Sequence, residues 1–570
     1  MTAKLILKNG PFEYKQGYLH GRNFPTLKVR VKSENAYDDW PQLLNNLVKR
    51  TQQHIEFMGF SVDSDGISID TTPLDSSSDW SVLSIPVLHC NTDIIYQCWR
   101  LALFTSEKSL DTAALKKLEP MKRNSPSPLM TNAANVLGLP LFIIANATAQ
   151  YGLGRNSRWF NHTFSEQTSN LSARLARDKK LSIQRLRTAG LPTTKHYLVS
   201  SLNHALDAAK HLGYPVVAKP YNQDGGGGVT AAITDAKELT FAYEKATKFN
   251  KSVLIEKHVE GRDYRLTVFD GKLVWAVERR PAGVTGDGSS SIKQLIEKEN
   301  QNPARMPGSA KQTLKPLQLN KDAELMLAKQ QLKASDVPKK GQFVRLHSIA
   351  NVATGGTPHV VTDMVHPDNA VLAERAAAAL RLDLAGVDLI IPDISRSWRE
   401  TGAAICEVNG QPDLGSTTAR HLYTELLASR VPQQGRIPVV ILVYAADAAD
   451  ADGAAAQAVE AAQQTAAELR KQYENVGCSL PTLPALKAAD ILSTRQNFIN
   501  DTEIFHASND FYHVAVMFLT DQTLDALVMC ASADDVLQQG LPVQRVDTLK
   551  FYGAIAPAVR KALEPHIVST

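Results

Sequence analysis

A lysine at the end of an apolar segment, followed by four glycines, is the first feature here that could do chemistry. The segment reads YPVVAKPYNQDGGGGVTAA, with Lys219 in its first half. Glycines let backbone N–H groups approach phosphate oxygens without Cβ clashes, and a lysine supplies a compact positive charge. The pattern predicts a phosphate-binding loop, and a glycine-rich hairpin beside a surface lysine is the alternative. The glycines predicted to contact phosphate are Gly226, Gly227 and Gly228.

A second polar segment combines a strand with a charged turn. It reads SVLIEKHVEGRDYRLTVFDGKLV, and its turn contains Glu256, Lys257 and Asp263. The backbone of such a hinge can read an adenine edge, and an acid a few residues later can bind ribose hydroxyls. A solvated charged hairpin is the alternative interpretation, because charge runs are usually exposed.

Two neighbouring apolar segments carry the side chains that could hold a metal. Asp388 lies within GVDLIIPD, while Glu407 and Asn409 lie two residues apart in AAICEVNGQ. Residues i and i+2 share one face of a strand, so two antiparallel neighbours could present all three side chains to one point. Oxygen donors with few carboxylates suit magnesium bound to ATP phosphates. Polar residues at strand ends beside a loop are the alternative.

The elements around these motifs alternate between strands and helices. Residues 161–432 contain the strands YPVVAKP, SVLIEKHV, GVDLIIPD and AAICEVN, and we expect one helix across SNLSARLARDKKLSIQRLRTAG. A polar stretch at about 292–340 is predicted to be a mostly helical, exposed insertion. The fold class expected is α/β multidomain: an α+β region at 1–160, a central domain at 161–432 and a small doubly wound α/β domain at 433–570.

The C-terminal region has its own apolar segments. VVILVYAA is predicted to be a buried parallel strand, and an Ala-rich helix follows from about Ala454 to Tyr473. HVAVMFL and ALVMCA are predicted to be further buried strands. In the N-terminal region, TLKVRVKS alternates like a half-buried strand, and DDWPQLLNNLVKRTQQHIEFMGF has helical spacing.

Composition limits the classes of function. The 570 residues carry a net charge of +4, which is too weak to argue for a nucleic-acid or membrane partner. The five cysteines include no CxxC pair, so neither a disulfide framework nor a zinc site is indicated. The N-terminus lacks the pattern of a signal peptide, and no apolar run reaches about 18 residues. We therefore expect a cytoplasmic protein.

Taken in order, the three motifs resemble the ATP-grasp ligases, and more narrowly the ATP-grasp part of cyanophycin synthetase. The narrower resemblance rests on QTSNLSARLARDKKLSIQRLRTAGLP, VEGRDYRLTVFDGKLVWAVERRPAGVTGDG, RLHSIANVATGGT, TDMVHPDN and AGVDLIIPDI. It covers residues 161 to about 420. VTGDG followed by ATGGT is specific to that branch. YLHGRNFPTLKVRV and YGLGRNSRWF add a weaker resemblance in the N-terminal region.

The resemblance implies ATP and Mg²⁺ as cofactors and assigns roles to the residues that match. The ligase would phosphorylate a carboxylate, and an amine would then attack the acyl phosphate, giving an amide. Cofactor binding would fall to Lys179, Lys219, the glycines named above, Glu256, Lys257, Val259 and Asp263, the last at the ribose. Magnesium would be ligated by Asp388, Glu407 and Asn409. The candidates for clamping substrate carboxylate or acyl phosphate are Arg279, Arg345 and Arg265, for each of which a surface ion pair is the alternative.

Two departures from the family pattern bear on the expected product. The segment resembling N-L-S-T-G-G has Ala353 in place of its serine, and the run after Asn409 is GQPDLG instead of A-x-P-G. Cyanophycin synthetase also continues into a Mur-ligase-like half with a P-loop, whereas residues 444–452 read YAADAADAD and contain no lysine. We therefore expect a degenerate, nucleotide-free C-terminal domain, one active site, and no alternating polymerisation.

Three functions stay open at this stage. The first is a ligase that joins amino acids, or an amino acid and a small peptide, and that forms a homo-oligomer, either a dimer or a tetramer. The second is a non-catalytic or regulatory partner of a cyanophycin-type ligase. The third is a γ-glutamyl ligase of the glutathione-synthetase type, which would share the ATP site.

Overall fold

The computed structural model describes residues 5–7, 13–15, 18, 26–33, 40–58, 70–73, 81–86, 92–104, 112–118, 120–121, 125–221, 227–306, 313–347, 350, 352–415, 418–446, 451–482, 495–506 and 510–568. The chain forms two compact units. One unit is Thr163–Leu422, and the other combines Met1–His162 with Tyr423–Thr570. The mixed α/β class predicted above is confirmed, whereas the division into three domains stays a prediction.

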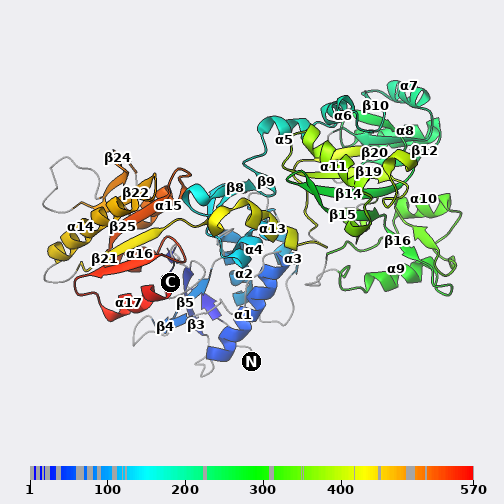
Figure 1. Ribbon diagram of the computed structural model, residues 1–570. Coiled ribbons are helices and arrows are strands. Elements are labelled where there is room, and N and C mark those ends of the chain that lie inside the picture. The colour runs from blue at the N-terminus through cyan, green and yellow to red at the C-terminus, as the bar shows by residue number, and fades with distance from the viewer. Residues whose placement is uncertain are drawn as a thin grey trace. The chain divides into compact units, whose positions relative to one another are not determined.

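The central unit is built on a five-stranded antiparallel sheet (Figure 1). Its strands, in spatial order, are β18 (Thr357–Val360), β15 (Lys272–Arg280), β14 (Arg262–Phe269), β19 (Leu384–Ile391) and β20 (Ala404–Asn409). Alternate residues of a strand point to opposite faces. One face therefore buries apolar side chains such as Leu266 and Val387 in a core shared with α11 (Pro367–Ala379). The polar side chains of the candidate site lie on the other face.

A smaller four-stranded sheet carries the first two motifs. Its order is β10 (His196–Val199), β13 (Val253–Lys257), β11 (Val216–Pro220) and β12 (Thr230–Ile233). Two helices share its core, α7 (Leu202–Leu212) and α8 (Ala236–Thr247). Both are capped by side chains: Ser201 accepts from the N–H of His204, and Asp235 from that of Glu238. The Lys219 strand is thereby fixed between β13 and β12.

The single helix predicted at residues 169–190 is wrong in one respect, because the structure has two helices there. They are α5 (Asn170–Arg177) and α6 (Lys179–Thr188). Asp178 between them adopts an extended conformation, and its carboxylate accepts from the N–H groups of Lys180 and Leu181. A side-chain acceptor at this position starts a new helix, and it makes Lys179 the first residue of α6.

The polar stretch at about 292–340 contains α9 (Ile292–Asn300) and α10 (Lys321–Lys329). These helices pack on a two-stranded sheet formed by β16 (Gly283–Thr285) and β17 (Phe343–Arg345). Apolar residues from all four elements form a small core of their own. The stretch is thus a packed subdomain of the central unit, and its exposed polar residues cover that core.

The N-terminal part of the other unit is α+β. The predicted strand TLKVRVKS is β3 (Thr26–Ser33), which pairs with β1 (Leu5–Leu7), β2 (Glu13–Lys15) and β5 (Ser81–Pro86), and β5 also pairs with β4 (Asp70–Pro73). The predicted helix is α1 (Trp40–Phe57). The remaining elements of this part are α2 (Thr92–Phe104), α3 (Thr112–Leu118), α4 (Pro128–Leu137), β6 (Leu141–Ala145), β7 (Thr148–Tyr151) and β8 (Arg158–Asn161).

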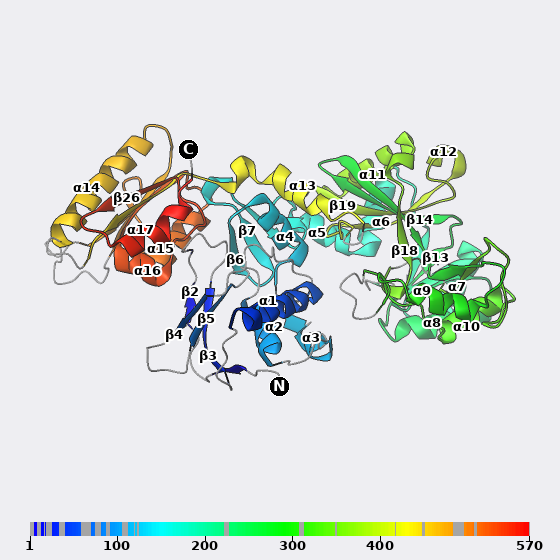
Figure 2. The same cartoon turned by 90° about the horizontal axis from the view of Figure 1, so that it is seen from below.

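The C-terminal part is a six-stranded sheet with helices on both faces (Figure 2). Its order is β24 (Thr502–Glu503), β23 (Arg495–Ile499), β22 (Val476–Pro481), β25 (Ala526–Ser532), β21 (Val439–Tyr444) and β26 (Thr548–Tyr552), of which the last four are parallel. The helix α14 (Ala451–Leu469) covers one face. The other face is covered by α15 (Phe511–Thr520), α16 (Ala533–Gln539) and α17 (Pro557–Leu563). This is the doubly wound arrangement that the sequence predicted.

The predicted strand HVAVMFL is wrong, because it forms the helix α15. Asp510 caps the helix by accepting from the N–H of His513. The buried residues then recur at helical spacing, with Phe511, Val514, Ala515 and Phe518 on one side. An apolar run of this length fits a strand or a buried helix equally well, and the cap decides between them. In the part of the chain that the structure describes, no helix has the length and apolar character needed to cross a bilayer.

Candidate functional site

Asp388 and Glu407 face each other across two antiparallel strands. They are register partners on β19 and β20, and Asn409 lies opposite Gly386 two pairs further along. The pairing shifts after Asp388, where β20 has one extra residue, Cys406. Because the core side chains Ile405 and Val408 remain on the opposite face, this bulge turns Glu407 and Asn409 toward Asp388. The predicted convergence of the three side chains is the observed geometry.

Two arginines surround Asp388. Arg265, the register partner of Asp388 on β14, donates from Nε to Oδ1 in a short hydrogen bond and from Nη2 to Oδ2 at 3.2 Å. Arg279 Nη2 lies 3.2 Å from Asp388 Oδ2 and 2.5 Å from Asp263 Oδ1. Burial raises the pKa of the Asp388 carboxyl, but the two guanidinium groups outweigh it and hold this pKa below its usual value. Asp388 is therefore ionised at neutral pH.

Asp263, predicted to bind ribose, belongs to the same cluster. Its Oδ1 accepts from Nε and Nη2 of Arg279, at 2.9 and 2.5 Å. Burial raises the pKa of the Asp263 carboxyl, with a smaller contribution from the charge of Asp388. The ribose assignment stays a prediction. In this structure the carboxylate positions Arg279.

Glu407 is held by the lysine at the start of α6. Lys179 Nζ lies 3.7 Å from Glu407 Oε1. With its amide turned to satisfy both neighbours, Asn409 donates to Glu407 Oε1 and accepts from Arg265 Nη2, each at 3.3 Å. Burial raises the pKa of the Glu407 carboxyl, and the attraction of Lys179 opposes this. The break between α5 and α6 thus brings Lys179 to the carboxylate pair.

Lys219 forms the tightest lysine–carboxylate pair near the site. Its Nζ lies 2.7 Å from Glu256 Oε1, and the two side chains are only 14% and 7% exposed. Burial lowers the pKa of the Lys219 ammonium, but Glu256 outweighs it and raises this pKa above its ordinary value. His196 on β10 is the register partner of Glu256, and its buried Nδ1 has no hydrogen-bond partner among the described residues.

The glycine loop lies between β11 and β12. Gly226 falls outside the described residues, whereas Gly227 and Gly228 are described. Gly228 has φ +77°, and a Cβ placed there would approach Phe249 to 2.7 Å and Pro220 to 2.8 Å. Only glycine combines that backbone conformation with so close an approach. Gly228 therefore packs directly against Pro220, the end of the Lys219 strand.

Two backbone N–H groups of the predicted adenine hinge already donate hydrogen bonds within the protein. The N–H groups of Lys257 and His258 donate to the carbonyls of Lys195 and Pro215, at 2.9 and 3.1 Å. The Lys257 ammonium donates to the carbonyls of Gly213 and Tyr214, at 2.8 and 3.2 Å. Lys257 therefore secures the hinge, and no contact of its side chain with the Asp388 cluster is present among the described residues. Val259, at the end of the hinge, stays a predicted contact of the nucleotide base.

Arg345 is placed apart from the other two arginines. It lies on β17, where its backbone exchanges hydrogen bonds with the Gln330 side chain. The pKa of His258 in the hinge is lowered by burial and, to a smaller extent, by the positive charge of Arg345. Burial lowers the pKa of the Arg345 guanidinium. The structure thus unites Arg265 and Arg279 around Asp388 and puts Arg345 on the hinge side. Ala353, predicted to mark an altered substrate pocket, lies in a segment whose side chain is outside the described residues.

Two polar residues on the same face of the sheet were missed by the sequence analysis. Thr267 and Trp275 are register partners on β14 and β15, two pairs beyond Arg265. Both are buried, and neither Thr267 Oγ1 nor Trp275 Nε1 has a hydrogen-bond partner among the described residues. Trp275 packs against Gly415, where a Cβ would come within 2.6 Å of its ring. Only their alternation with Leu266 and Ala276 could have assigned them to the site face.

Comparisons with known proteins agree with the motif order. A protein-family model described as D-ala D-ala ligase C-terminus matches residues 186–312. A cyanophycin synthetase from Trichormus variabilis is 30% identical over 414 residues, which are 71% of this chain and 43% of that protein. The glutathione biosynthesis bifunctional protein GshAB from Desulfotalea psychrophila is 33% identical over 238 residues, 41% of this chain and 30% of its own length.

Among solved structures, a bifunctional glutathione synthetase from Pasteurella multocida aligns with a TM-score of 0.39 and 23% identity, covering 59% of this chain and 49% of that one. The chain spans less than half the length of the Trichormus cyanophycin synthetase. The sequence comparisons confirm the predicted resemblance of this chain to the cyanophycin synthetases and, with them, to the ATP-grasp ligases.

Proposed function

We propose that this protein is an ATP- and Mg²⁺-dependent carboxylate–amine ligase that joins amino acids, or an amino acid and a small peptide, through an acyl phosphate. The observation that carries the proposal is the pairing of Asp388 with Glu407, with Asn409 beside them, on the face of the five-stranded sheet opposite α11. Four basic side chains surround this set: Arg265, Arg279, Lys179 and, from the smaller sheet, Lys219.

The donor set fits magnesium. The described residues contain no group of three or more His, Cys, Asp and Glu side chains arranged for a metal ion. Magnesium prefers hard oxygen donors and usually takes only one or two protein carboxylates together with phosphate oxygens. Two carboxylates and one amide oxygen meet that requirement. Asp388, Glu407 and Asn409 would hold the ion, which would supply charge neutralisation.

The nucleotide fits the other half of the site. The glycines of the loop after β11 carry no Cβ, so their backbone N–H groups would be able to approach phosphate oxygens closely. Lys219 and Lys179 would bind phosphate oxygens through their side-chain nitrogens. The hinge from Glu256 to Val259 would line the adenine.

The proposed reaction requires the protein to position the substrates and to neutralise the negative charge of the phosphates. In the first step a carboxylate oxygen attacks the γ-phosphorus of ATP and ADP leaves. In the second step the amine attacks the acyl carbon, the C–O bond to phosphate breaks, and the amine loses a proton. Arg279 and Arg265 are placed to bind the anionic acyl phosphate or the substrate carboxylate, since guanidinium groups match such oxygens in a bidentate manner.

Phosphate release over a panel of amino-acid and dipeptide pairs tests the proposal. ATP should be consumed only when a suitable acid and amine are both present, with ADP and phosphate as products. Release of AMP and pyrophosphate would contradict the acyl-phosphate route. No turnover with any pair, in protein shown to be folded, would contradict the ligase assignment.

A matched pair of variants separates catalysis from folding. Glu407→Gln keeps the side-chain shape but removes a proposed metal carboxylate, and turnover should fall at least about 100-fold if electrostatic stabilisation depends on it. Glu374→Gln is the control, because that carboxylate is about equally exposed, 21% against 27%, and lies on α11 at the opposite face. Equal activities of the two variants would show that Glu407 has no catalytic role.

Two other functions stay open as alternatives. The similarity to GshAB supports a γ-glutamyl ligase as one alternative. Competition between γ-glutamyl dipeptides and free amino acids in the same assay distinguishes this alternative from the proposed amino-acid ligase. A non-catalytic partner of a cyanophycin-type ligase would retain its role in cells when Glu407 is replaced by Gln. We also propose that the protein has a single ATP site. The loop at residues 444–452 lacks a P-loop lysine, and its residues 447–450 lie outside the described residues.

We also propose a homo-oligomer, dimer or tetramer, with small molecules as the other partners. Light scattering after gel filtration measures the assembly directly. A monomer at the concentrations used for the phosphate-release assay would contradict this part of the proposal without affecting the ligase assignment.

A further inference from the structure

Two motifs that the sequence analysis singled out take no part in the chemistry proposed above. They are VTGDG at residues 284–288 and ATGGT at residues 353–357, and both lie in the central unit. VTGDG belongs to the subdomain formed by β16, β17, α9 and α10, called here the inserted subdomain, where Gly286 exchanges backbone hydrogen bonds with Gly341 and Gln342. ATGGT follows this subdomain and leads into β18. A buried arginine joins the two.

Arg305 lies after α9 and is only 2% exposed. Its Nε donates to Glu299 Oε1 at 3.0 Å, and its Nη1 donates to the carbonyls of Lys315 and Gly355, at 2.8 and 2.9 Å. Glu299 and Lys315 belong to the inserted subdomain, whereas Gly355 is the first glycine of ATGGT. Because a buried guanidinium has to satisfy its donors, Arg305 ties this turn to the subdomain.

Apolar contacts hold the same turn. A Cβ placed on Gly355 would lie 3.2 Å from Leu317 and 3.4 Å from Ala282, and both of these residues are buried in the core of the inserted subdomain. The Leu317 backbone is fixed in turn by the side chain of Asn300, which donates to its carbonyl at 2.9 Å and accepts from its N–H at 2.8 Å. The turn at Gly355 therefore packs directly on the inserted subdomain.

Ala282 lies on the connection between two of the candidate substrate arginines. Arg279, on β15, comes three residues before it, and Gly283, directly after it, is the register partner of Arg345 on β17. The Ala282 carbonyl also accepts from the N–H of Leu346, the residue after Arg345, at 2.7 Å. A displacement of Ala282 would therefore change the distance between Arg279 and Arg345.

The turn also reaches Arg279 by a second path. Pro358 on β18 follows Gly355 by three residues and is the register partner of Arg279. Backbone pairing thus connects the turn to the strand of Arg279, and the contact with Ala282 connects it to the strand pair of Arg345. Since the groups of a catalytic site have to be held within about 0.5 Å of their productive positions, a tie at this turn affects both arginines.

We propose that Arg305 is a positioning residue for the substrate end of the ligase site. By holding the Gly355 carbonyl it fixes the turn against Ala282, and this sets the spacing of Arg279 and Arg345, which would bind the substrate carboxylate. The inference rests on the proposed ligase function. It gives the inserted subdomain a role in recognising the acid substrate, whereas the nucleotide would bind mainly to the smaller sheet.

Steady-state kinetics of Arg305→Lys is the first test, in the full-length protein with the acid and amine found by phosphate release. Lysine keeps the charge beside Glu299 but lacks the fork that reaches two carbonyls. The KM for the acid should rise at least about tenfold, since a shift of about 1 Å in positioning groups costs up to about 100-fold. The KM for ATP should change less than about twofold.

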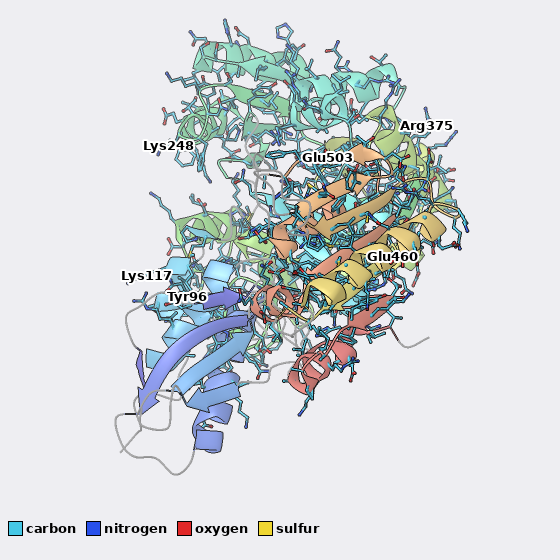
Figure 3. The ribbon with its side chains drawn as sticks, turned by 90° about the vertical axis from the view of Figure 1, so that its left-hand side faces the viewer. Tyr96, Lys117, Lys248, Arg375, Glu460 and Glu503 are labelled. Carbon is cyan, nitrogen blue, oxygen red and sulfur yellow. The ribbon has the colours of Figure 1, made fainter. Side chains whose placement is uncertain are left out.

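Arg375→Lys is the matched control for the substitution itself. Arg375 also donates to a backbone carbonyl, that of Ala189 at 3.0 Å, but its side chain is exposed on α11 (Figure 3). This helix packs on the face of the sheet away from the candidate site. Both KM values should be unchanged in Arg375→Lys.

Two more variants separate positioning from stability. Asn320 caps α10 by accepting from the N–H of Ala323 at 3.0 Å, so Asn320→Ala should destabilise the inserted subdomain without touching the turn, and the KM for the acid should stay unchanged. Gly355→Ala shifts the turn itself, because its Cβ would press on the core of the subdomain. It should raise the KM for the acid, and it replaces Arg305→Lys in the test if that variant fails to fold.

Hydrogen exchange followed by mass spectrometry tests the tie without turnover. Backbone amides of residues 352–360 should exchange at least about threefold faster in Arg305→Lys than in Asn320→Ala, because only the first variant releases the turn. The proposal is overturned if these exchange rates are equal, if Arg305→Lys has the same KM for the acid as Arg375→Lys, or if Asn320→Ala raises that KM equally. If the unmodified protein turns over no substrate pair, the ligase function fails and the positioning role with it, and faster exchange would then confine Arg305 to fixing the turn.

Discussion

Replacing Glu256 with glutamine removes the partner of the buried Lys219 ammonium and keeps the side-chain shape. The two charges lie 2.7 Å apart, on side chains 14% and 7% exposed. At an effective dielectric constant near 20, their attraction is about 6 kcal/mol, an upper bound because the cost of burying both charges opposes it. Breaking such a pair by removing one partner costs about 3–5 kcal/mol. We expect a value near the lower end, since glutamine retains one acceptor oxygen.

The effect should depend on pH in one direction only. The pKa of Lys219 is raised in the folded protein, so the pair contributes fully below the unfolded pKa of about 10.4. Its contribution is then lost as pH rises through the higher, folded pKa. The difference in stability between the original protein and Glu256→Gln should therefore be constant from pH 7 to 9 and shrink in strong base.

A double-mutant cycle with Lys219→Met measures the pair in urea unfolding, followed by circular dichroism without nucleotide. Glu260→Gln is the matched control, because Glu260 lies four residues away and is exposed. The cycle isolates the pairwise contribution from the loss of each side chain. A coupling energy below about 0.5 kcal/mol, no larger than the uncertainty of such cycles, would refute the reasoning that the pair is buried and direct.

Three further substitutions test the site. Gly228→Ala should destabilise the central unit by about 1–3 kcal/mol, because φ +77° and a 2.7 Å approach to Phe249 both disfavour a Cβ; a melting temperature equal to that of the original protein would contradict this. Thr267→Val should stabilise the protein by about 1 kcal/mol, since it removes a buried hydroxyl without a described partner; destabilisation in urea would instead reveal an unseen partner such as an ordered water. Gly415→Ala should destabilise the central unit by an amount similar to that of Gly228→Ala, because Gly415 has φ +76° and its Cβ would lie 2.6 Å from the Trp275 ring. It should also lower ligase turnover, because the loop that follows β20 would move away from Trp275, and unchanged turnover would argue against that.

The sequence predicted that three side chains of the candidate site converge, because their placement follows from local patterns. Asp388, Glu407 and Asn409 occupy neighbouring apolar segments, and two-residue periodicity assigns Glu407 and Asn409 to one face. Only the register could show that Asp388 lies opposite Glu407, and the bulge at Cys406 that makes this possible has no sequence signature. The pairing of Lys219 with Glu256 joins strands 37 residues apart in sequence, which periodicity alone does not reveal.

Some local predictions failed because two structures fit the same residues. HVAVMFL is apolar enough for a strand, but the carboxylate of Asp510 starts a helix there. Residues 169–190 have helical spacing throughout, yet Asp178 ends one helix and caps the next. In both cases a single acidic side chain decides the backbone, since an N-cap competes directly with continued regular structure.

The sequence by itself determined the resemblance to ATP-grasp ligases, the α/β class and the residue types of the site, since these reside in motif order and alternation. Tertiary structure alone decided which charges meet. It placed Asp263 on Arg279, set Arg345 apart from Arg265, and buried Arg495 at the edge of the C-terminal sheet. Pairing of charges depends on distances between strands remote in sequence, and those distances exist only once the strands have packed.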